Sequence, residues 1–409
     1  MITAISPAML ADAFARQLAI PAPLPEGQPW RAQDLAAGAA GSALLHIERA
    51  RAGDGTWQQA HSWIKTAVAT TISAGDTSGL YLGAPAAAFM LDCAVIAETP
   101  RYRDALTALD RHVIDLAHRR CDAARTRMRH GHPARFHEYD LFYGLTGIGA
   151  YLLRRSPSGS AMSRVLDYLV RLTRPIRHGD LGVFPGWWVD HQPDLTPSTV
   201  PAGHANLGTA HGITGPLLLL ARALRQGVRV DGHEDAIDTI LDWLDTWRQD
   251  GPAGPWWPEH LHLGDLRAGR PAQIGPARPS WCYGTPGIAR AGQLAALARD
   301  DPARQRLYED AMARCLTDSD QLSKITDGGL CHGWAGVYQT AFRAAHDATT
   351  PALHAVLPEL AAALTRHARP GPGLDPGLLQ GTAGTALALT TAAHDAAPTS
   401  GWDACLLID

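Results

Sequence analysis

Two short motifs in the second half of the chain carry side chains that could bind a metal ion. Cys282 lies in Trp-Cys-Tyr-Gly-Thr-Pro-Gly at residues 281–287, and Cys331 and His332 begin Cys-His-Gly-Trp-Ala-Gly at residues 331–336. Two thiolates and one imidazole are ligands that zinc prefers, and three protein ligands leave a tetrahedral position open, as in catalytic sites. A buried cysteine or a loop histidine is the commoner role of any one of them. Their equivalent places in successive repeats favour the metal site.

The same small-residue turn occurs seven times along the chain, and each copy is followed by a nearly uncharged apolar segment. Six copies are Gly-x-x-Gly, whereas the second ends in Ala86. The first glycines of the copies are Gly38, Gly83, Gly144, Gly212, Gly284, Gly333 and Gly381. Segments between the turns, such as 102–125 and 302–316, have helical periodicity and one charged face. Each repeat therefore predicts one helix buried on all sides and one amphipathic helix.

This repeat predicts an all-α fold with the architecture of an α/α toroid, a double ring of seven inner and seven outer helices. We expect it to form a single domain over residues 1–409. Glycine allows the sharp turn at the start of each inner helix, and the turns should gather at one end of the ring. Two long inserts rich in Trp, Pro and Gly, near residues 179–205 and 250–279, either pack over the ring ends or rim this end, and short strands are expected in them.

The residue before the first glycine of each turn should face a common bowl. These residues are Ala37, Leu82, Tyr143, His211, Tyr283, His332 and Gln380. One position further back, the fifth and sixth copies add Cys282 and Cys331. Reactive side chains are therefore expected in copies three to six, and copies one, two and seven are expected to be structural.

Three further residues near these copies could assist a reaction. His211 occupies the position equivalent to His332 but lacks a neighbouring cysteine, so it fits a general acid/base better than a fourth ligand, with a core or capping histidine as the alternative. Asp140 either caps a helix or orients and polarises a histidine. Arg278 is either a solvated loop charge or a cation that stabilises developing negative charge.

Composition and charge exclude several classes of protein. The net charge is −4, and the arginine-rich stretch 119–129 lies among acids and alanines, so we interpret it as a solvated helix face and expect no nucleic-acid partner. No apolar stretch reaches membrane-spanning length, and the first residues do not form a secretory signal. The six cysteines are scattered, which argues against a disulfide framework and favours a reducing, cytoplasmic setting.

Over essentially its whole length the chain resembles the LanC-like family of lanthipeptide cyclases. The motifs that carry the resemblance lie at residues 140–147, 210–215, 281–287, 331–336 and 378–384. The resemblance implies an α/α toroid that binds one zinc ion through Cys282, Cys331 and His332. It also implies that His211 and Asp140 form the acid/base pair, with Arg278 and Tyr283 as supporting residues.

The resemblance further implies a stand-alone lantibiotic cyclase of the class I type, since no large extra N-terminal region is present. Such an enzyme adds cysteine thiols of a precursor peptide to dehydroalanine or dehydrobutyrine and forms lanthionine or methyllanthionine rings. A separate dehydratase and an exporter are the implied partners, and the protein would be cytoplasmic or peripheral to the membrane through that complex.

Three alternatives to the cyclase remain at this point. A LanC-like zinc protein could add another thiol, such as glutathione, to dehydro-residues, and a zinc-bound scaffold could serve a synthetase complex without catalysis. A toroid hydrolase of carbohydrates would need paired carboxylates facing the bowl, and only Asp140 meets that requirement.

Overall fold

The computed structural model describes residues 5–409 except 97–99, 179–181, 195, 198–201 and 372. These described residues contain 17 α-helices and six short strands. By contact density the chain divides into two compact units, one of residues 1–113, 325–407 and 409 and the other of residues 114–324 and 408. The single domain expected over residues 1–409 stays a prediction.

Each of the seven predicted turns leads into a helix that is buried almost all round. These helices are α2 (Ala39–Ala52), α4 (Ala84–Ala94), α7 (Leu145–Arg155), α9 (Thr214–Arg225), α12 (Thr285–Ala298), α15 (Trp334–Asp347) and α17 (Thr382–His394). The first glycine of the turn is the N-cap residue of six of them, and α9 differs because its N-cap is Ile213, one residue after Gly212. In α12 every residue from Thr285 to Ala296 is buried. The predicted apolar helices are confirmed.

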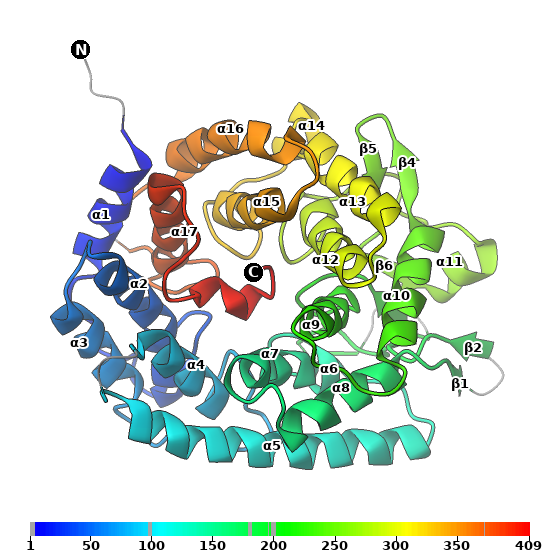
Figure 1. Cartoon of the computed structure of the whole chain (residues 1–409), viewed down its shortest axis with the longest axis horizontal. Coiled ribbons are helices and arrows are strands. Elements are labelled where there is room, and N and C mark those ends of the chain that lie inside the picture. The colour runs from blue at the N-terminus through cyan, green and yellow to red at the C-terminus, as the bar shows by residue number, and fades with distance from the viewer. Residues whose placement is uncertain (1–4, 97–99, 179–181, 195, 198–201, 372) are drawn as a thin grey trace. The chain divides into compact units, whose positions relative to one another are not determined.

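Helices with one exposed face pack against these buried ones. They are α1 (Pro7–Gln17), α3 (Trp57–Ala67), α8 (Ser160–Leu172), α10 (His233–Trp247), α13 (Pro302–Cys315) and α16 (Ala352–His367). The long helix α5 (Arg103–Arg129) also has an exposed face, and its residues belong to both units. In the second unit α12 packs against both α9 and α13, and in the first unit α2 packs against α3 and α15 against α16 (Figure 1). Short helices complete the described chain, namely α6 (Phe136–Tyr139), α11 (Leu263–Ala268), α14 (Ser319–Leu322) and the 3-10 helices η1 (Pro29–Gln33) and η3 (Trp402–Leu406).

Backbone hydrogen bonds join neighbouring turns within each unit. In the second unit the Leu141 amide donates to the Ala210 carbonyl at 3.1 Å, and the Thr209 amide donates to the Cys282 carbonyl at 2.9 Å. In the first unit the Cys331 amide donates to the Leu379 carbonyl at 2.8 Å, and the Leu379 amide donates to the Ala36 carbonyl at 2.9 Å. The expected gathering of the turns is therefore observed inside each unit.

The last glycine of the turn is required by close backbone approach. A Cβ atom on Gly336 would lie 1.9 Å from the Leu330 carbonyl oxygen, and one on Gly287 would lie 2.1 Å from the Trp281 carbonyl oxygen. No side chain fits at such distances, so any other residue would push the turn away from its own helix. Gly284 adds a φ of 101°, a conformation that residues with a Cβ atom rarely adopt.

The two long inserts carry short strands, as predicted. The strands are β1 (Ile176–His178), β2 (Gly182–Phe184), β3 (His204–Asn206), β4 (Gln249–Gly251), β5 (Gly254–Trp256) and β6 (His260–His262). β3 pairs antiparallel with β6, and this pairing places Asn206 opposite His260 and ties one insert to the other. Residues 179–181, 195 and 198–201 of the first insert lie outside the described residues.

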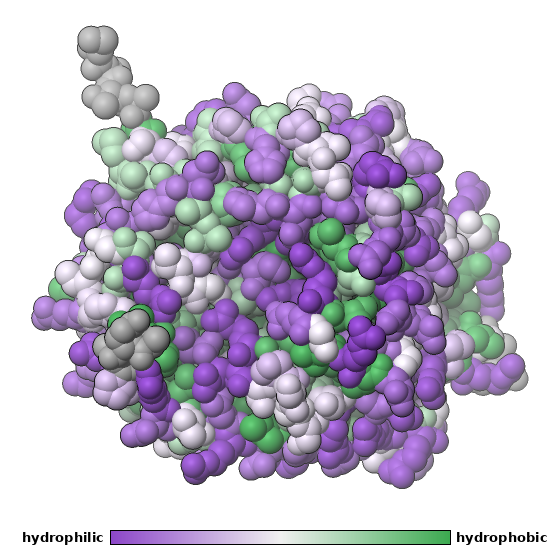
Figure 2. Space-filling model, in the orientation of Figure 1, coloured by the Kyte–Doolittle hydropathy of each residue, from purple (hydrophilic) through white to green (hydrophobic). Residues whose placement is uncertain are grey.

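Hydrophilic side chains cover most of the face drawn in Figure 2, with hydrophobic ones scattered among them. In the described part of the chain, no helix combines the length and the hydropathy needed to cross a membrane. The longest described helix, α5, has 27 residues and a repeated charged face. None of the six cysteines forms a disulfide bond in this structure.

The interpretation of residues 119–129 as a solvated helix face is wrong for two arginines. Arg120 is only 7% exposed and donates hydrogen bonds to the carbonyls of Tyr143 and His137. Arg127 pairs with Glu138 at 2.5 Å, with both side chains 13% exposed. Both arginines therefore brace the segment that leads to Asp140, because a buried guanidinium needs partners for its donors.

Candidate active site

Cys282 lies in the turn that leads into α12. Its side chain is buried, with 5% exposed, and its carbonyl accepts the hydrogen bond from the Thr209 amide. The Ser280 hydroxyl lies 3.5 Å from the Cys282 sulfur and also bonds to the Tyr283 carbonyl. The thiol is thus fixed by its own turn and by the turn that carries His211.

Cys331 and His332 lie in the turn that leads into α15, and both are partly exposed. The Nε2 atom of His332 lies 3.6 Å from an Asp327 carboxylate oxygen, and the other Asp327 oxygen accepts a hydrogen bond from the Gly329 amide at 2.9 Å. A carboxylate next to one ring nitrogen helps to orient a histidine that binds metal through the other.

The donor atoms of Cys282, Cys331 and His332 all lie within 4.8 Å of one another, and no other such group of three occurs among the described residues. In a tetrahedral zinc site with Zn–S of about 2.3 Å and Zn–N of about 2.0 Å, ligand atoms are about 3.5–3.8 Å apart. A small contraction of the side chains would therefore bring them to bonding geometry. The donor set and its spacing fit a zinc ion.

Three other cysteines lie outside this group, and burial is the main cause that raises the pKa of each of their thiols. Burial raises the pKa of the Cys121 thiol to about 12 and that of the Cys315 thiol to about 12. Burial also raises the pKa of Cys405 well above its ordinary value. These thiols stay protonated and are poor ligands, because the thiolate is the form that binds metal.

His211 and Asp140 form a hydrogen-bonded pair in the second unit. The Nδ1 atom of His211 lies 2.7 Å from one Asp140 oxygen, and the carboxylate is fully buried while the His211 side chain is 14% exposed. The other Asp140 oxygen accepts hydrogen bonds from the Tyr143 and Gly144 amides at 2.7 and 2.8 Å. Asp140 therefore ties the turn before α7 to His211. The interpretation of Asp140 as a cap of α7 is wrong, because its two amide partners precede the helix and the N-cap residue is Gly144, with no side-chain cap.

Aromatic rings surround the His211 imidazole. Phe142 contacts it edge-on with ring centroids 4.9 Å apart, Phe136 does so at 5.9 Å, and Tyr143 stacks on it at 6.4 Å. These contacts and the bond to Asp140 leave the ring little freedom to rotate. Its Nε2 atom is the one that can exchange a proton with a substrate.

Tyr283 is held by a residue that the sequence analysis missed. The Asn206 amide nitrogen donates to the Tyr283 hydroxyl at 2.8 Å, and the Asn206 amide oxygen accepts from the Gly208 amide at 2.8 Å. Burial raises the pKa of Tyr283, so the phenol stays protonated. Since Asn206 already fills an acceptor position on that oxygen, the phenol hydrogen remains available to donate elsewhere. The pairing of β3 with β6 was the only signal that could have located Asn206, and a single sequence does not reveal it.

Arg278 lacks a hydrogen bond to His211 or Tyr283 among the described residues. It is half-buried, and its Nε atom has no hydrogen-bond partner among the described residues. Its charge acts on Glu259, whose pKa is raised by burial and by Cys282 and lowered by Arg278. Its catalytic role therefore stays a prediction.

The residues that precede the seven turns share a further property. Each is exposed or half-exposed although the glycine that follows it is buried. This alternation fits the expectation that they face open space, and it holds for Tyr143, His211, Tyr283 and His332 alike.

Comparison with known proteins gives three similarities. Residues 29–407 match the family model described as "Lanthionine synthetase C-like protein". The nisin biosynthesis protein NisC of Lactococcus lactis subsp. lactis is 25% identical over 210 residues, which are 49% of this chain and 48% of NisC. The chain thus aligns with about half the length of that relative.

A solved structure, a nisin cyclase, superposes with a TM-score of 0.79 at 18% identity, covering 98% of this chain and 96% of that one. At this identity the likeness shows the fold alone. It confirms the predicted fold class, an all-α protein of the α/α-toroid type with a few short strands.

Proposed function

Because the chain belongs to the lanthionine synthetase C-like family, we propose that it is a zinc-dependent lanthipeptide cyclase. Its reaction would be the intramolecular Michael-type addition of a precursor-peptide thiol to dehydroalanine or dehydrobutyrine. The observation that carries the proposal is the group of Cys282, Cys331 and His332, which offers two sulfurs and one nitrogen within 4.8 Å. The hydrogen-bonded pair of His211 and Asp140 supplies the proton chemistry that the addition needs.

Cys282, Cys331 and His332 are the residues that would hold the zinc ion. A zinc ion held there would lower the pKa of a substrate thiol in its fourth position and so supply a thiolate near neutral pH. Cys331 and His332 are partly exposed, which suits residues that a substrate thiol must reach.

The addition requires one proton at the end. The substrate sulfur forms a bond to the β-carbon of the dehydro-residue, and the electron pair of the double bond moves to the α-carbon and its carbonyl oxygen as an enolate. The enolate then takes a proton at the α-carbon, and the proton lost by the thiol balances it. Product and substrate therefore have the same mass.

His211 is the residue that would give this proton. Because Nδ1 donates its hydrogen to Asp140, Nε2 of the neutral ring is available to take the proton that the thiol loses and, as imidazolium, to give it to the α-carbon. The buried Asp140 carboxylate stabilises the imidazolium that exists before the proton is given up. Tyr283 can donate its phenol hydrogen to the peptide, and Arg278 would stabilise the enolate oxygen.

A dehydrated precursor peptide tests the proposal. After incubation with zinc-loaded protein, the peptide is treated with a thiol-alkylating reagent and its mass shows how many thiols remain free. We expect the number of free thiols to fall with wild-type protein and to stay unchanged with Cys282→Ala or Cys331→Ala. Cys315→Ala removes a buried thiol that is no ligand and is expected to retain activity.

The same assay separates the alternatives. Glutathione adducts on the peptide, with its own thiols still free, would support addition of an external thiol and contradict the cyclase. Unchanged peptide with zinc-loaded protein would point to a scaffold. We also propose a dehydratase as the source of the substrate, an exporter as a further partner, and a cytoplasmic setting, either free or at the membrane through that complex.

A further inference from the structure

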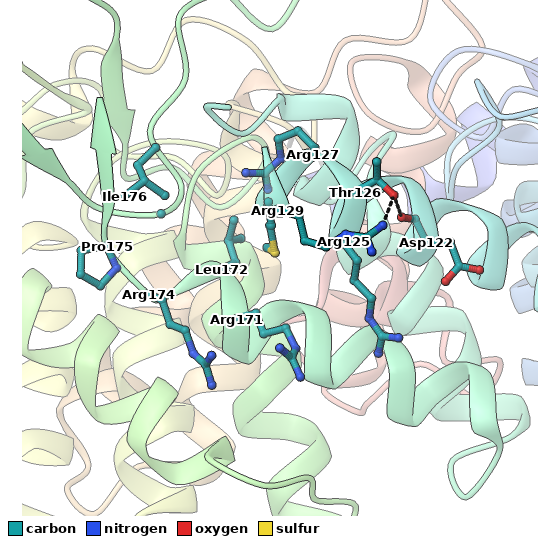
Figure 3. Close-up of a pocket in the computed structure, with 12 residues that line it drawn as sticks. Asp122, Arg125, Thr126, Arg127, Arg129, Arg171, Leu172, Arg174, Pro175 and Ile176 are labelled. Atoms are coloured by element: carbon teal, nitrogen blue, oxygen red, sulfur yellow. Dashed lines mark hydrogen bonds between the residues drawn. The ribbon is translucent and has the colours of Figure 1, made fainter. Parts of the chain in front are cut away.

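A groove of about 770 Å³ opens in the second unit beside α5, α8 and β1 (Figure 3). Five arginines line it, together with apolar residues at its base and a single carboxylate, Asp122. The arginines are Arg125, Arg127, Arg129, Arg171 and Arg174. Figure 3 shows the side chains of Arg125, Arg171 and Arg174 extending in the same direction along one side of the groove.

Two acidic residues pair with three of the five arginines. Asp167 accepts hydrogen bonds from Arg125 at 2.7 Å and from Arg171 at 3.0 Å, so one carboxylate serves two guanidinium groups. Glu138 pairs with Arg127 at 2.5 Å. Asp122, although it lines the groove, pairs with Arg164 outside it.

Two arginines of the groove have no acidic partner among the described residues. The guanidinium of Arg129 bonds to the Thr126 hydroxyl at 3.1 Å, and Arg174 forms no ion pair within the part of the chain that the structure describes. Both side chains are exposed. In a chain of net charge −4, this is a local excess of positive charge.

The base of the groove is apolar and fixed in shape. Leu172 is 1% exposed, and Ile176 belongs to β1. A Cβ atom on Gly186 would lie 2.1 Å from the Leu172 carbonyl and 2.4 Å from the Arg174 carbonyl. This close packing holds the backbone of residues 172–174, so Arg174 projects from a rigid base.

The groove is also connected to the segment that carries Asp140. Glu138, the partner of Arg127, lies in α6 two residues before Asp140, and the Tyr168 hydroxyl donates to the same carboxylate at 2.8 Å. A ligand on the arginines would therefore bind beside the element that positions the acid/base pair.

We propose that this groove binds an acidic segment of the substrate peptide, a stretch of Asp and Glu residues outside the part that forms rings. Guanidinium groups bind carboxylates through two parallel hydrogen bonds, and an apolar base accommodates the side chains between the acids. Excess positive charge also speeds the approach of an acidic partner. The identification of the bound peptide as a substrate rests on the proposed function. The expected affinity for acidic peptide does not depend on that function.

The test compares the double variant Arg129→Gln/Arg174→Gln with wild-type protein. The probe is a fluorescent synthetic peptide that contains a run of Asp and Glu, and its binding is followed by anisotropy. We expect wild type to bind it with an affinity that falls as salt rises, and the variant to bind at least about tenfold more weakly. The matched control Arg229→Gln/Arg306→Gln removes two exposed charges of the same unit elsewhere and should bind like wild type.

Equal binding by wild type and the groove variant would overturn the proposal. The proposal would also be overturned if wild-type protein bound a peptide whose acidic residues are replaced by Gln and Asn equally well. A third contradicting result would be that inorganic phosphate, at the same concentration as the acidic peptide, displaces that peptide fully. Ring closure on a dehydrated peptide without the acidic stretch should be unchanged in the groove variant. If wild-type protein closes no rings on that peptide, the result contradicts the proposed function. The binding experiment then decides by itself whether the groove binds acidic peptide.

Discussion

Asp140 combines two tasks that usually fall to different residues. One oxygen accepts hydrogen bonds from the Tyr143 and Gly144 amides in the turn before α7, and the other holds His211. Because these amides fix the carboxylate, the carboxylate in turn fixes the imidazole. The position of the proposed proton donor therefore depends on the turn that leads into α7.

Substitutions at Asp140 can separate these tasks. Asp140→Asn keeps an oxygen for the amides of Tyr143 and Gly144 but cannot balance an imidazolium, so we expect ring closure to slow by about 10²–10⁴-fold with little change in stability. Asp140→Ala should show the same loss and also lower the free energy of unfolding by about 1–2 kcal/mol, because the Tyr143 and Gly144 amides lose their acceptor. Turnover and urea unfolding of both variants check this, and a fully active Asp140→Asn protein would contradict the role of the pair.

His211 itself should be dispensable for metal. We expect His211→Ala to keep its zinc and to lose turnover, because the imidazole bonds to Asp140 and not to the metal group. Metal analysis and the free-thiol assay on the same preparation test this. A zinc-free His211→Ala protein would place the imidazole among the ligands instead.

Asn206 is expected to act through Tyr283. Removing its amide in Asn206→Ala should slow ring closure by about tenfold, since the phenol loses its hydrogen-bond donor. In a Tyr283→Phe background the same change should have little further effect, because the two side chains form one unit. If the two effects instead multiply in a double-mutant cycle, Asn206 does not work by positioning Tyr283.

Among the elements, the helix starts were predictable and the strand pairing was not. The turns could be located by their glycines, which are required where a backbone carbonyl approaches within about 2 Å of a Cβ position, as at Gly336, although the second turn has Ala86 in that place. The site residues Cys282, Cys331 and His211 were found because they lie at fixed places before those glycines. Asn206 was not, because the partner of β3 is β6, more than fifty residues away, and no local pattern records that pairing.

The arginine-rich stretch on α5 shows a different limit of prediction from sequence. Periodicity predicts the helix and its exposed face, but it does not tell which arginine finds a buried partner. Arg120 reaches carbonyls of the turn before α7, and Arg127 reaches Glu138 on α6. Such contacts depend on tertiary packing.

Gly336 provides a test of the turn. A methyl group there would meet the Leu330 carbonyl at 1.9 Å, so Gly336→Ala should lower the free energy of unfolding by about 2–4 kcal/mol and weaken zinc retention by moving Cys331 and His332. Gly275→Ala is the matched control, since nothing lies within 4 Å of its Cβ position. Thermal unfolding and metal content of the two variants measure the difference, and a Gly336→Ala protein as stable as the control would contradict the steric argument.

For the whole molecule, buried neutral histidines make stability depend on pH. Burial lowers the pKa of His204 to about 3, with His260 and His262 adding to the shift, and burial lowers the pKa of His46 to about 4. Above the unfolded value near 6.5 both rings are neutral in either state. Below it the unfolded chain binds protons that the folded protein does not, so stability falls as pH decreases toward the folded pKa.

We expect each of these two histidines to lower the free energy of unfolding by about 1 kcal/mol between pH 7 and pH 5.5. Neither ring nitrogen of His204 has a hydrogen-bond partner among the described residues, so His204→Phe should fold and show a weaker loss over this interval. Urea unfolding of both proteins at the two pH values tests this. Identical pH dependence in the variant would show that His204 titrates normally.

The central claim is that Cys282, Cys331 and His332 together hold one zinc ion, and elemental analysis of purified protein tests it most directly. We predict about one zinc per chain in wild type and in Cys315→Ala, and little or none in Cys282→Ala or Cys331→Ala. Wild-type protein that holds no zinc after incubation with the metal and removal of the excess, or ligand variants that retain a full equivalent, would contradict the account.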